Sequence, residues 1–175
     1  MEPMKPAEII HHLKQGKIFV YPGNEAYELF CSIDCMESLE KLIGAEIEGV
    51  PSLIAHSKQW IVRNLHANSK YIDKLPGPFT FILKSKNSLK LHKGLVNDDK
   101  ISVRLTNNDL SKLLAKEKLI LFSCLLKKKN KFIIDISDVS RKVKKLADFV
   151  IDAGKLEIKP HVVIDLTGKI AKLVK

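Results

Sequence analysis

The stretch that decides the fold is Leu75-Pro76-Gly77-Pro78-Phe79-Thr80-Phe81-Ile82-Leu83, where two prolines bracket a glycine and the chain continues into an apolar segment. Proline fixes φ and glycine permits positive φ, so the turn is expected to be rigid and of defined shape. Phe79, Phe81 and Leu83 alternate with their neighbours, which suits a largely buried strand. The stretch therefore predicts a rigid turn that enters a core strand.

Helical and strand-like patterns alternate on both sides of this turn. Apolar residues at helical spacing predict helices at 6–15, 35–43, 58–65, 69–75, 110–116 and 139–146. Short apolar runs bounded by turn residues predict strands at 17–21, 52–55, 80–85, 100–105, 119–123, 149–152, 161–166 and 170–174, whereas 26–31 stays ambiguous. This interleaving predicts an α/β fold of the α+β type: one three-layer domain over 1–175, with a twisted mixed sheet covered by helices.

Composition limits the class of protein. The 175 residues suffice for one domain with a core, and no apolar run is long enough for a transmembrane helix, so no membrane partner is expected. The polar first residues lack the layout of a signal peptide. Three cysteines do not form a disulfide framework, and their spacing to each other and to the histidines does not match a zinc site. We therefore expect a cytoplasmic protein without a bound metal; the oligomeric state stays open.

Net charge is the strongest compositional signal. The chain carries a formal charge of +10, which favours anionic partners such as RNA, DNA or nucleotides. The basic set is almost entirely lysine, with arginine only at Arg63, Arg104 and Arg141. A high lysine content can also arise from genome composition. The sequence therefore leaves open whether the basic surface binds a ligand or only keeps the protein soluble.

Four blocks, in order along nearly the whole chain, resemble the motifs of one family. The opening turn and strand are similar to its "PGP-[YLF]-T" block, and 18–29 are similar to its "YPTDTxYGL" block. Ile101-Ser102-Val103-Arg104 resembles its "VxVR" strand, and 151–154 with 160–167 resemble its "LDAG…PSTVIDLT" ending. The chain thus resembles the YrdC family of threonylcarbamoyl-adenylate synthases.

This resemblance implies a fold and a reaction. Family members condense L-threonine, bicarbonate and ATP, with Mg²⁺ accompanying the ATP, into threonylcarbamoyl-AMP and pyrophosphate. The product is used to modify adenosine 37 of tRNA, and the basic cleft of the family has also been described as binding double-stranded RNA. By resemblance, the residues at nucleotide- or threonine-binding positions are Asn24, Tyr27, Arg104, Ser123 and His161.

The polar positions of the motifs differ from the family pattern. The family's Thr-Asp-Thr falls on Gly23-Asn24-Glu25, and the glycine after the loop's tyrosine falls on Glu28. A Lys-x-Arg pair that binds carboxylate and phosphates falls on Glu46 and Glu48, an anion pair that would repel a triphosphate. In the "SAN" loop only Ser123 is retained, since Leu125 replaces the asparagine.

Several residues admit two interpretations. Arg104 either contacts a phosphate, for which guanidinium geometry is well suited, or forms a salt bridge at the end of its strand. Ser123 either binds nucleotide or caps its own backbone. His161 is more readily structural than a general base, because no carboxylate partner can be assigned. Asp165 lies in an apolar strand and needs a partner if buried.

Two basic clusters are candidates for RNA binding. They comprise the predicted loop residues Lys127, Lys128, Lys129 and Lys131 and the predicted helical residues Arg141, Lys144 and Lys145. Solvated lysines at a hairpin tip are the alternative. Three functions follow: a divergent threonylcarbamoyl-adenylate synthase, a catalytically inactive RNA-binding module, and an accessory subunit of the same pathway.

Overall fold

The computed structural model describes residues 4–86, 91–96, 98–157 and 162–174. Within these ranges one mixed sheet runs in the order β11-β10-β5-β6-β3-β7-β2-β1-β9, with β4 added to β5 and β8 to β7. Its strands are β1 (Phe19–Pro22), β2 (Tyr27–Ser32), β3 (Gly49–Ile54), β4 (Leu65–His66), β5 (Phe79–Ser85), β6 (Lys100–Arg104), β7 (Leu121–Lys128), β8 (Lys131–Phe132), β9 (Phe149–Val150), β10 (Val162–Asp165) and β11 (Lys172–Leu173).

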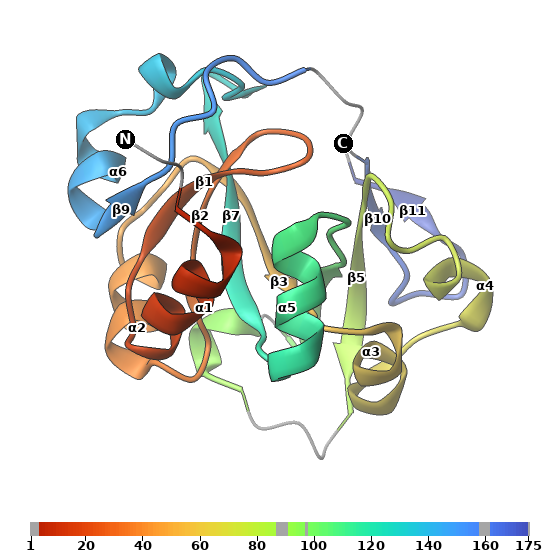
Figure 1. The fold of residues 1–175 in the computed structure, drawn as a ribbon. Coiled ribbons are helices and arrows are strands. Elements are labelled where there is room, and N and C mark those ends of the chain that lie inside the picture. The colour runs from red at the N-terminus through yellow and green to blue at the C-terminus, as the bar shows by residue number, and fades with distance from the viewer. Residues whose placement is uncertain (1–3, 87–90, 97, 158–161, 175) are drawn as a thin grey trace.

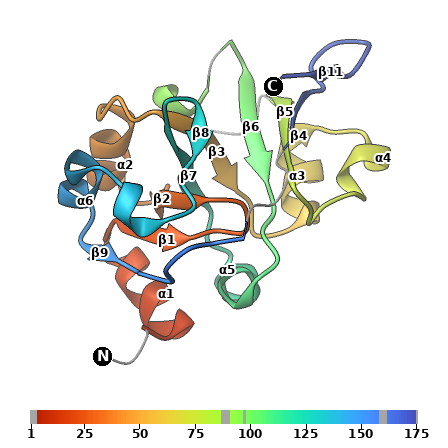
Figure 2. The same ribbon diagram turned by 90° about the horizontal axis from the view of Figure 1, so that it is seen from above.

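Helices cover both faces of this sheet (Figures 1 and 2). They are α1 (Pro6–Lys14), α2 (Met36–Ile43), α3 (Lys58–Asn64), α4 (Ser69–Ile72), α5 (Asp109–Glu117) and α6 (Arg141–Leu146), with short 3₁₀ turns η1 (Lys93–Leu95) and η2 (Ile136–Asp138). Because side chains alternate along a strand, Phe19 and Phe30 pack under α1 and α5. Val20 and Leu29 face the opposite way and pack with α2 and α6. The predicted three-layer α/β fold with a mixed sheet is confirmed.

The proline–glycine–proline turn enters the sheet as predicted, although the reason for the glycine differs. Phe81 and Leu83 of β5 are fully buried between α3, α4 and the strands beside them. Gly77 does not adopt a positive φ. A Cβ atom there would lie 2.7 Å from the Lys74 carbonyl oxygen and 3.1 Å from the Phe79 ring. Close approach of the backbone, rather than a left-handed conformation, therefore requires glycine at this position.

Two segments differ from the sequence-based expectation. The ambiguous residues 26–31 form strand β2, which is buried along its length and lies between β1 and β7. Strand β7 continues from Leu121 to Lys128, so the predicted loop at 127–131 is a β7–β8 hairpin. Its turn residues Lys129 and Asn130 have φ values of 50° and 63°, as in a type I′ turn. The "SAN"-like segment is thereby part of a strand.

A short parallel pairing between β1 and β9 fixes the segment that follows α6. The Asp148 carboxylate accepts hydrogen bonds from the Ile18 amide at 2.9 Å and from Lys17 Nζ at 3.2 Å. Burial acts to raise the pKa of Asp148, but the Ile18 amide and Lys17 outweigh it and hold that pKa below the ordinary value. Ionised Asp148 therefore stabilises the junction of β9 with β1.

A depressed carboxyl pKa makes this contribution depend on pH. It is fully present above the unfolded-state pKa of about 3.9 and is lost as pH falls through the lower folded-state pKa. We expect Asp148→Asn to flatten the loss of unfolding free energy between about pH 5 and pH 2. Urea unfolding across this range measures it, with the exposed Glu37→Gln variant as control. Parallel curves for Asp148→Asn and the unmodified chain would contradict the assignment.

Among the residues that the structure describes, no helix is long and apolar enough to cross a membrane.

Candidate functional site

Four neighbouring strands of the sheet bring a charged cluster into the interior. Arg104 ends β6, which pairs with β3 through Ile54↔Arg104. Ser52 of β3 lies opposite Ser123 of β7, and β7 pairs in turn with β2, which carries Glu28. Residues two apart along a strand share a face, so these four side chains point to the same side of the sheet. This is the face covered by α1 and α5.

The cluster is buried, and Nε and Nη2 of the guanidinium are hydrogen-bonded within it. Arg104 and Glu28 are each only 2% exposed. Arg104 Nη2 donates to Glu28 Oε2 and, at 3.0 Å, to Ser123 Oγ, while Arg104 Nε donates to Ser52 Oγ at 3.1 Å. The Ser123 hydroxyl donates to Glu28 Oε2 at 2.5 Å. Side chains of β2, β3 and β7 thus hold the guanidinium in place.

A second carboxylate lies on the other side of the guanidinium. Glu25 Oε2 is 3.7 Å from Arg104 Nη1, and Glu25 is 5% exposed. Burial together with the negative charges of Glu28 and Asp109 raises the pKa of Tyr21, which pairs with Glu28 across β1 and β2. Two carboxylates thus face one guanidinium in a region shielded from water.

The turn between β1 and β2 is shaped to accommodate Glu28. A Cβ atom at Gly23 would lie 2.9 Å from Glu28 Oε1 and 2.7 Å from the Ala26 carbonyl oxygen. A side chain at this position would therefore displace the Glu28 carboxylate. The two departures from the family pattern, glycine for threonine at 23 and glutamate for glycine at 28, are sterically coupled.

The cluster determines what the site can bind. A phosphate or carboxylate ligand of Arg104 would have to replace Glu28, and the displaced carboxylate would remain in a buried region. The negative charge of Glu25 would further oppose an incoming triphosphate. The residues around Arg104 do not fit the phosphates of ATP as they stand.

The structure brings two of the predicted ligand-binding residues together and separates a third from them. Arg104 and Ser123 are hydrogen-bonded. Tyr27 lies in the core of the opposite face, where its hydroxyl donates to the Gly154 carbonyl at 2.8 Å and accepts from the Ala153 amide at 3.0 Å. Asn24 is half-buried in the turn before Glu25. His161 lies outside the described residues.

Glu46 and Glu48, at positions where the family carries Lys-x-Arg, are exposed rather than part of this cluster. Glu48 accepts hydrogen bonds from the amides of Asn130 at 2.7 Å and Lys129 at 3.3 Å, and so stabilises the β7–β8 turn. Glu48 thus has a structural role in the hairpin.

Sequence reasoning missed Glu25, Glu28 and Ser52 as partners of Arg104. The available signal was serine and glutamate in otherwise apolar strands at Ser52 and Glu28, where a buried polar side chain needs a partner; Glu25 lies in the turn before β2. Asp165, by contrast, has the partners that its position required, since it accepts from the Thr167 amide at 2.8 Å and the Thr167 hydroxyl at 2.6 Å.

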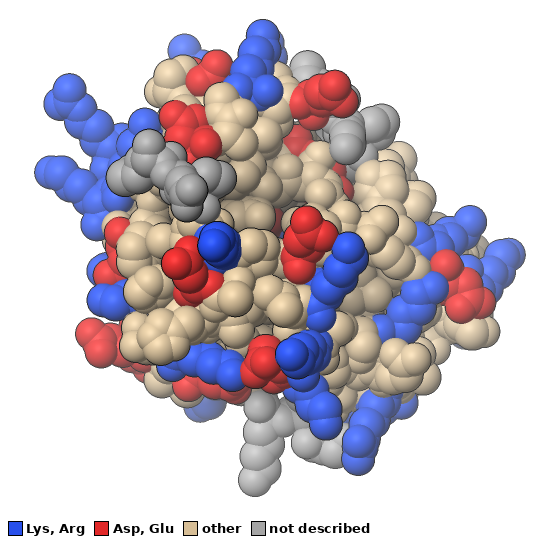
Figure 3. Space-filling view, viewed as in Figure 1, with Lys and Arg blue, Asp and Glu red and all other residues tan. Residues whose placement is uncertain are grey.

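Part of each predicted basic cluster borders a common groove. Lys127 and Lys128 of the hairpin and Arg141 and Lys142 of α6 line one cavity of about 460 Å³, together with Glu46, Glu48 and Asp138. Lys128 is paired with Asp138 at 2.8 Å, and Lys127 Nζ lies 4.9 Å from the Phe132 ring centre. Lys129 and Lys131 are exposed and line a separate cavity at the hairpin, Lys145 is exposed on α6, and Lys144 is half-buried there. In Figure 3, lysine and arginine side chains project beyond the outline at the upper left, the side on which α6 lies in Figure 1.

Neither metal ligands nor reactive thiols are gathered near this site. Over 4–86, 91–96, 98–157 and 162–174, no three His, Cys, Asp or Glu side chains are grouped to hold a metal ion. Burial raises the pKa of Cys31 and of Cys124 to about 12, so both thiols stay protonated at neutral pH.

Comparison with known proteins places the chain in a family. The Sua5/YciO/YrdC family model, described as "Telomere recombination", matches residues 11–175. The chain therefore belongs to the Sua5/YciO/YrdC family, and the predicted resemblance is confirmed.

Individual relatives share the sequence weakly and the fold closely. The chain is 25% identical over 182 residues to the uncharacterized protein YciO of Escherichia coli K12, covering 96% of this chain and 86% of YciO. The E. coli YciO crystal structure superposes with a TM-score of 0.76 at 22% identity, over 99% of this chain and 91% of that one.

Two larger proteins contain the same fold. Sua5 of P. abyssi, solved in complex with L-threonine, matches with a TM-score of 0.73 at 18% identity, over 98% of this chain and 54% of Sua5. Full-length HypF in a phosphate- and nucleotide-bound form matches with a TM-score of 0.74 at 17% identity, over 97% of this chain and 28% of HypF.

Proposed function

We propose that this chain serves the tRNA threonylcarbamoyl-adenosine pathway as an RNA-binding member of its family that does not itself make threonylcarbamoyl-AMP. The observation that carries the proposal is the Glu28 carboxylate on the guanidinium of Arg104. The resemblance assigns Arg104 to the binding of an anionic substrate, but here the carboxylate of Glu28 already neutralises its guanidinium. Because the pair is buried, separating the two side chains would cost several kcal/mol.

Two proteins with the same fold have been solved with ligands bound. The Sua5 structure holds L-threonine, and the HypF structure holds phosphate and nucleotide. Both are ligands with anionic groups. In this chain the corresponding fold carries Glu25 and Glu28 around Arg104, which disfavours such ligands.

The RNA-binding part of the proposal is supported by charge and by position. The net charge is +10, and exposed cations of the β7–β8 hairpin and α6 border one groove. Lysines bind phosphates as point charges and release counterions, without requiring a base-specific pocket. A tRNA or another double-stranded RNA is the partner that this surface suits.

Two measurements on the full chain test the proposal. Fluorescence anisotropy with a tRNA and with a double-stranded RNA should show affinity that falls steeply between about 50 and 200 mM salt. A pyrophosphate assay with ATP, Mg²⁺, L-threonine and bicarbonate should show no release above the no-threonine blank. Absent or salt-independent RNA binding would reject the first part, and pyrophosphate release that requires both threonine and bicarbonate would reject the second.

Threonylcarbamoyl-AMP synthesis is the second candidate. Arg104 and Ser123, both retained from the family motifs, are hydrogen-bonded on one face of the sheet, and this favours it. In that case ATP with Mg²⁺ and L-threonine would bind after Glu28 moved away from the guanidinium. The same pyrophosphate assay decides between the two. An accessory role would instead appear as co-purification with an intact synthase or the downstream transferase.

A further inference from the structure

Strand β11 forms one edge of the sheet, and no described strand pairs with its outer side (Figure 2). The Val174 amide donates to the Val163 carbonyl at 2.8 Å, and Lys172 lies two residues before Val174, so the backbone groups of both point toward β10. Backbone groups alternate in direction along an antiparallel strand, so the amide and carbonyl of Leu173 point outward. Such an open edge is a template on which another strand can pair.

One face of this edge is apolar. Among the described residues, Ile170 in the turn before β11 and Leu173 are the most exposed large apolar side chains, at 76% and 73%. Leu173 lies opposite Ile164, which packs against the core beneath α3 and α4. Leu173 thus continues an apolar face past the point where helices cover it. An exposed apolar group beside an open strand edge marks a site for another chain.

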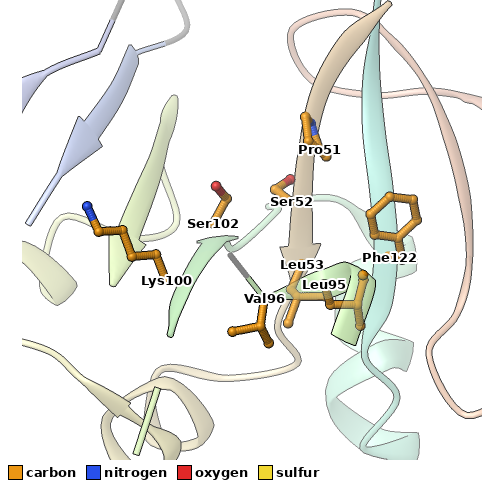
Figure 4. Close-up of a pocket in the computed structure, with 9 residues that line it drawn as sticks. Pro51, Ser52, Leu53, Leu95, Val96, Lys100, Ser102 and Phe122 are labelled. Carbon is orange, nitrogen blue, oxygen red and sulfur yellow. The ribbon is translucent and has the colours of Figure 1, made fainter. Parts of the chain in front are cut away.

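The opposite face of the edge is basic. Lys172 lies opposite Asp165, and the register continues through β5 to β6, so Lys84 and Lys100 lie on this same face. All three lysines are exposed. The Lys100 side chain turns away from Ser102 (Figure 4), and its ammonium lies 3.7 Å from Asp165. These three lysines outnumber the single carboxylate of Asp165, so an acidic partner complements this face.

We propose that β11 binds an extended segment of a partner protein in which acidic and apolar residues alternate. Main-chain hydrogen bonds to Leu173 hold the segment, and its side chains alternate between the two faces. Acidic side chains then meet Lys172, and apolar side chains meet Leu173. A second copy of this chain suits the edge less well, because an antiparallel pair of β11 strands puts both Lys172 ammonium groups on one face.

The test is an NMR titration of the isotope-labelled full chain without RNA, so its outcome is independent of the proposed function. The probe is the peptide acetyl-Gly-Glu-Val-Glu-Val-Glu-Gly-amide. One control peptide has lysine at each glutamate, and another has proline at each valine, which keeps the charge but prevents strand pairing. We expect saturable shifts of the Lys172, Leu173 and Val174 amides, with the probe binding about tenfold more tightly than either control. Its affinity should fall as salt rises.

Substitutions separate backbone pairing from charge. Leu173→Pro removes the outward amide and should weaken binding of the probe by about tenfold. Lys172→Gln should weaken it by about threefold and reduce its salt dependence. Lys41→Gln is the matched control and should have no effect, because Lys41 is exposed on α2, which packs on β2 toward the opposite edge of the sheet.

Several outcomes would overturn the proposal. They are absence of saturable shifts, equal affinity for the three peptides, and equal losses with Lys172→Gln and Lys41→Gln. Shifts of the same amides with protein concentration alone would identify a second copy as the occupant of the edge. Shifts with a tRNA but not with the peptide would identify RNA, and either result would also overturn the proposal.

Discussion

Replacing Glu28 with alanine is expected to lower the free energy of unfolding by about 3–5 kcal/mol. The substitution removes the carboxylate that neutralises Arg104 and accepts from Ser123, and both partners remain buried. The guanidinium is 2% exposed, and its Nη2 loses a charged acceptor that Glu25, 3.7 Å from Nη1 on the other side, does not replace. Urea unfolding at neutral pH measures the difference.

Two controls separate charge from packing. Glu37→Gln removes an exposed carboxylate and should change stability by no more than about 0.5 kcal/mol. A triple variant with Glu25→Gln, Glu28→Leu and Arg104→Leu should be more stable than Glu28→Ala, because it removes both carboxylates together with the guanidinium. A Glu28→Ala effect as small as that of Glu37→Gln would contradict a tightly paired cluster.

A small anion should partly reverse the Glu28→Ala defect. With the carboxylate gone, acetate or phosphate can enter and neutralise Arg104, and a ligand that binds only the folded state stabilises it. The expected result is a rise in unfolding free energy with anion concentration in Glu28→Ala, beyond the rise seen in the unmodified chain. The same anions should give no excess in Glu28→Ala combined with Arg104→Leu, where the cation is absent.

The fold could be predicted because it depends on local patterns. The turn into β5, the helical spacing before Gly16 and the apolar runs of β6 and β10 each carry their own signal. The sequence pattern leaves strand β2 ambiguous because the strand is buried on both sides, which removes the alternation that marks a half-buried strand. The pattern predicts a loop at the β7–β8 hairpin because charged residues dominate a strand end that projects into solvent.

The charged cluster could not be predicted in the same way. Glu28 and Arg104 are 76 positions apart, and Glu28 and Ser123 are 95 apart, so their contact depends on strand order and register. The resemblance marked position 28 as a lost glycine and did not supply a partner for its carboxylate. The strand register brings Arg104 next to the Glu28 carboxylate. The missing side chain at Gly23 leaves the room that this carboxylate occupies.

Neutralising four exposed cations should weaken RNA binding by about a hundredfold at low salt. The residues to change to glutamine are exposed cations of the β7–β8 hairpin and of α6: Lys129, Lys131, Arg141 and Lys145. Lys128 is left unchanged because Asp138 already pairs with it. If each substituted residue contacts a phosphate, the slope of log affinity against log salt should fall by about 3 to 4.

A second variant with four different cations replaced tests whether RNA binding depends on the hairpin and α6 or only on the total charge of the protein. Arg63 of α3, Lys70 of α4, Lys74 after α4 and Lys84 of β5 are exposed. These elements lie at the other end of the sheet from α6 (Figure 1). Changing these four residues to glutamine removes the same net charge and should reduce RNA affinity only slightly, with the slope nearly unchanged. Equal losses in the two sets would show that long-range attraction by net charge accounts for the binding, and that the hairpin and α6 do not form the RNA site.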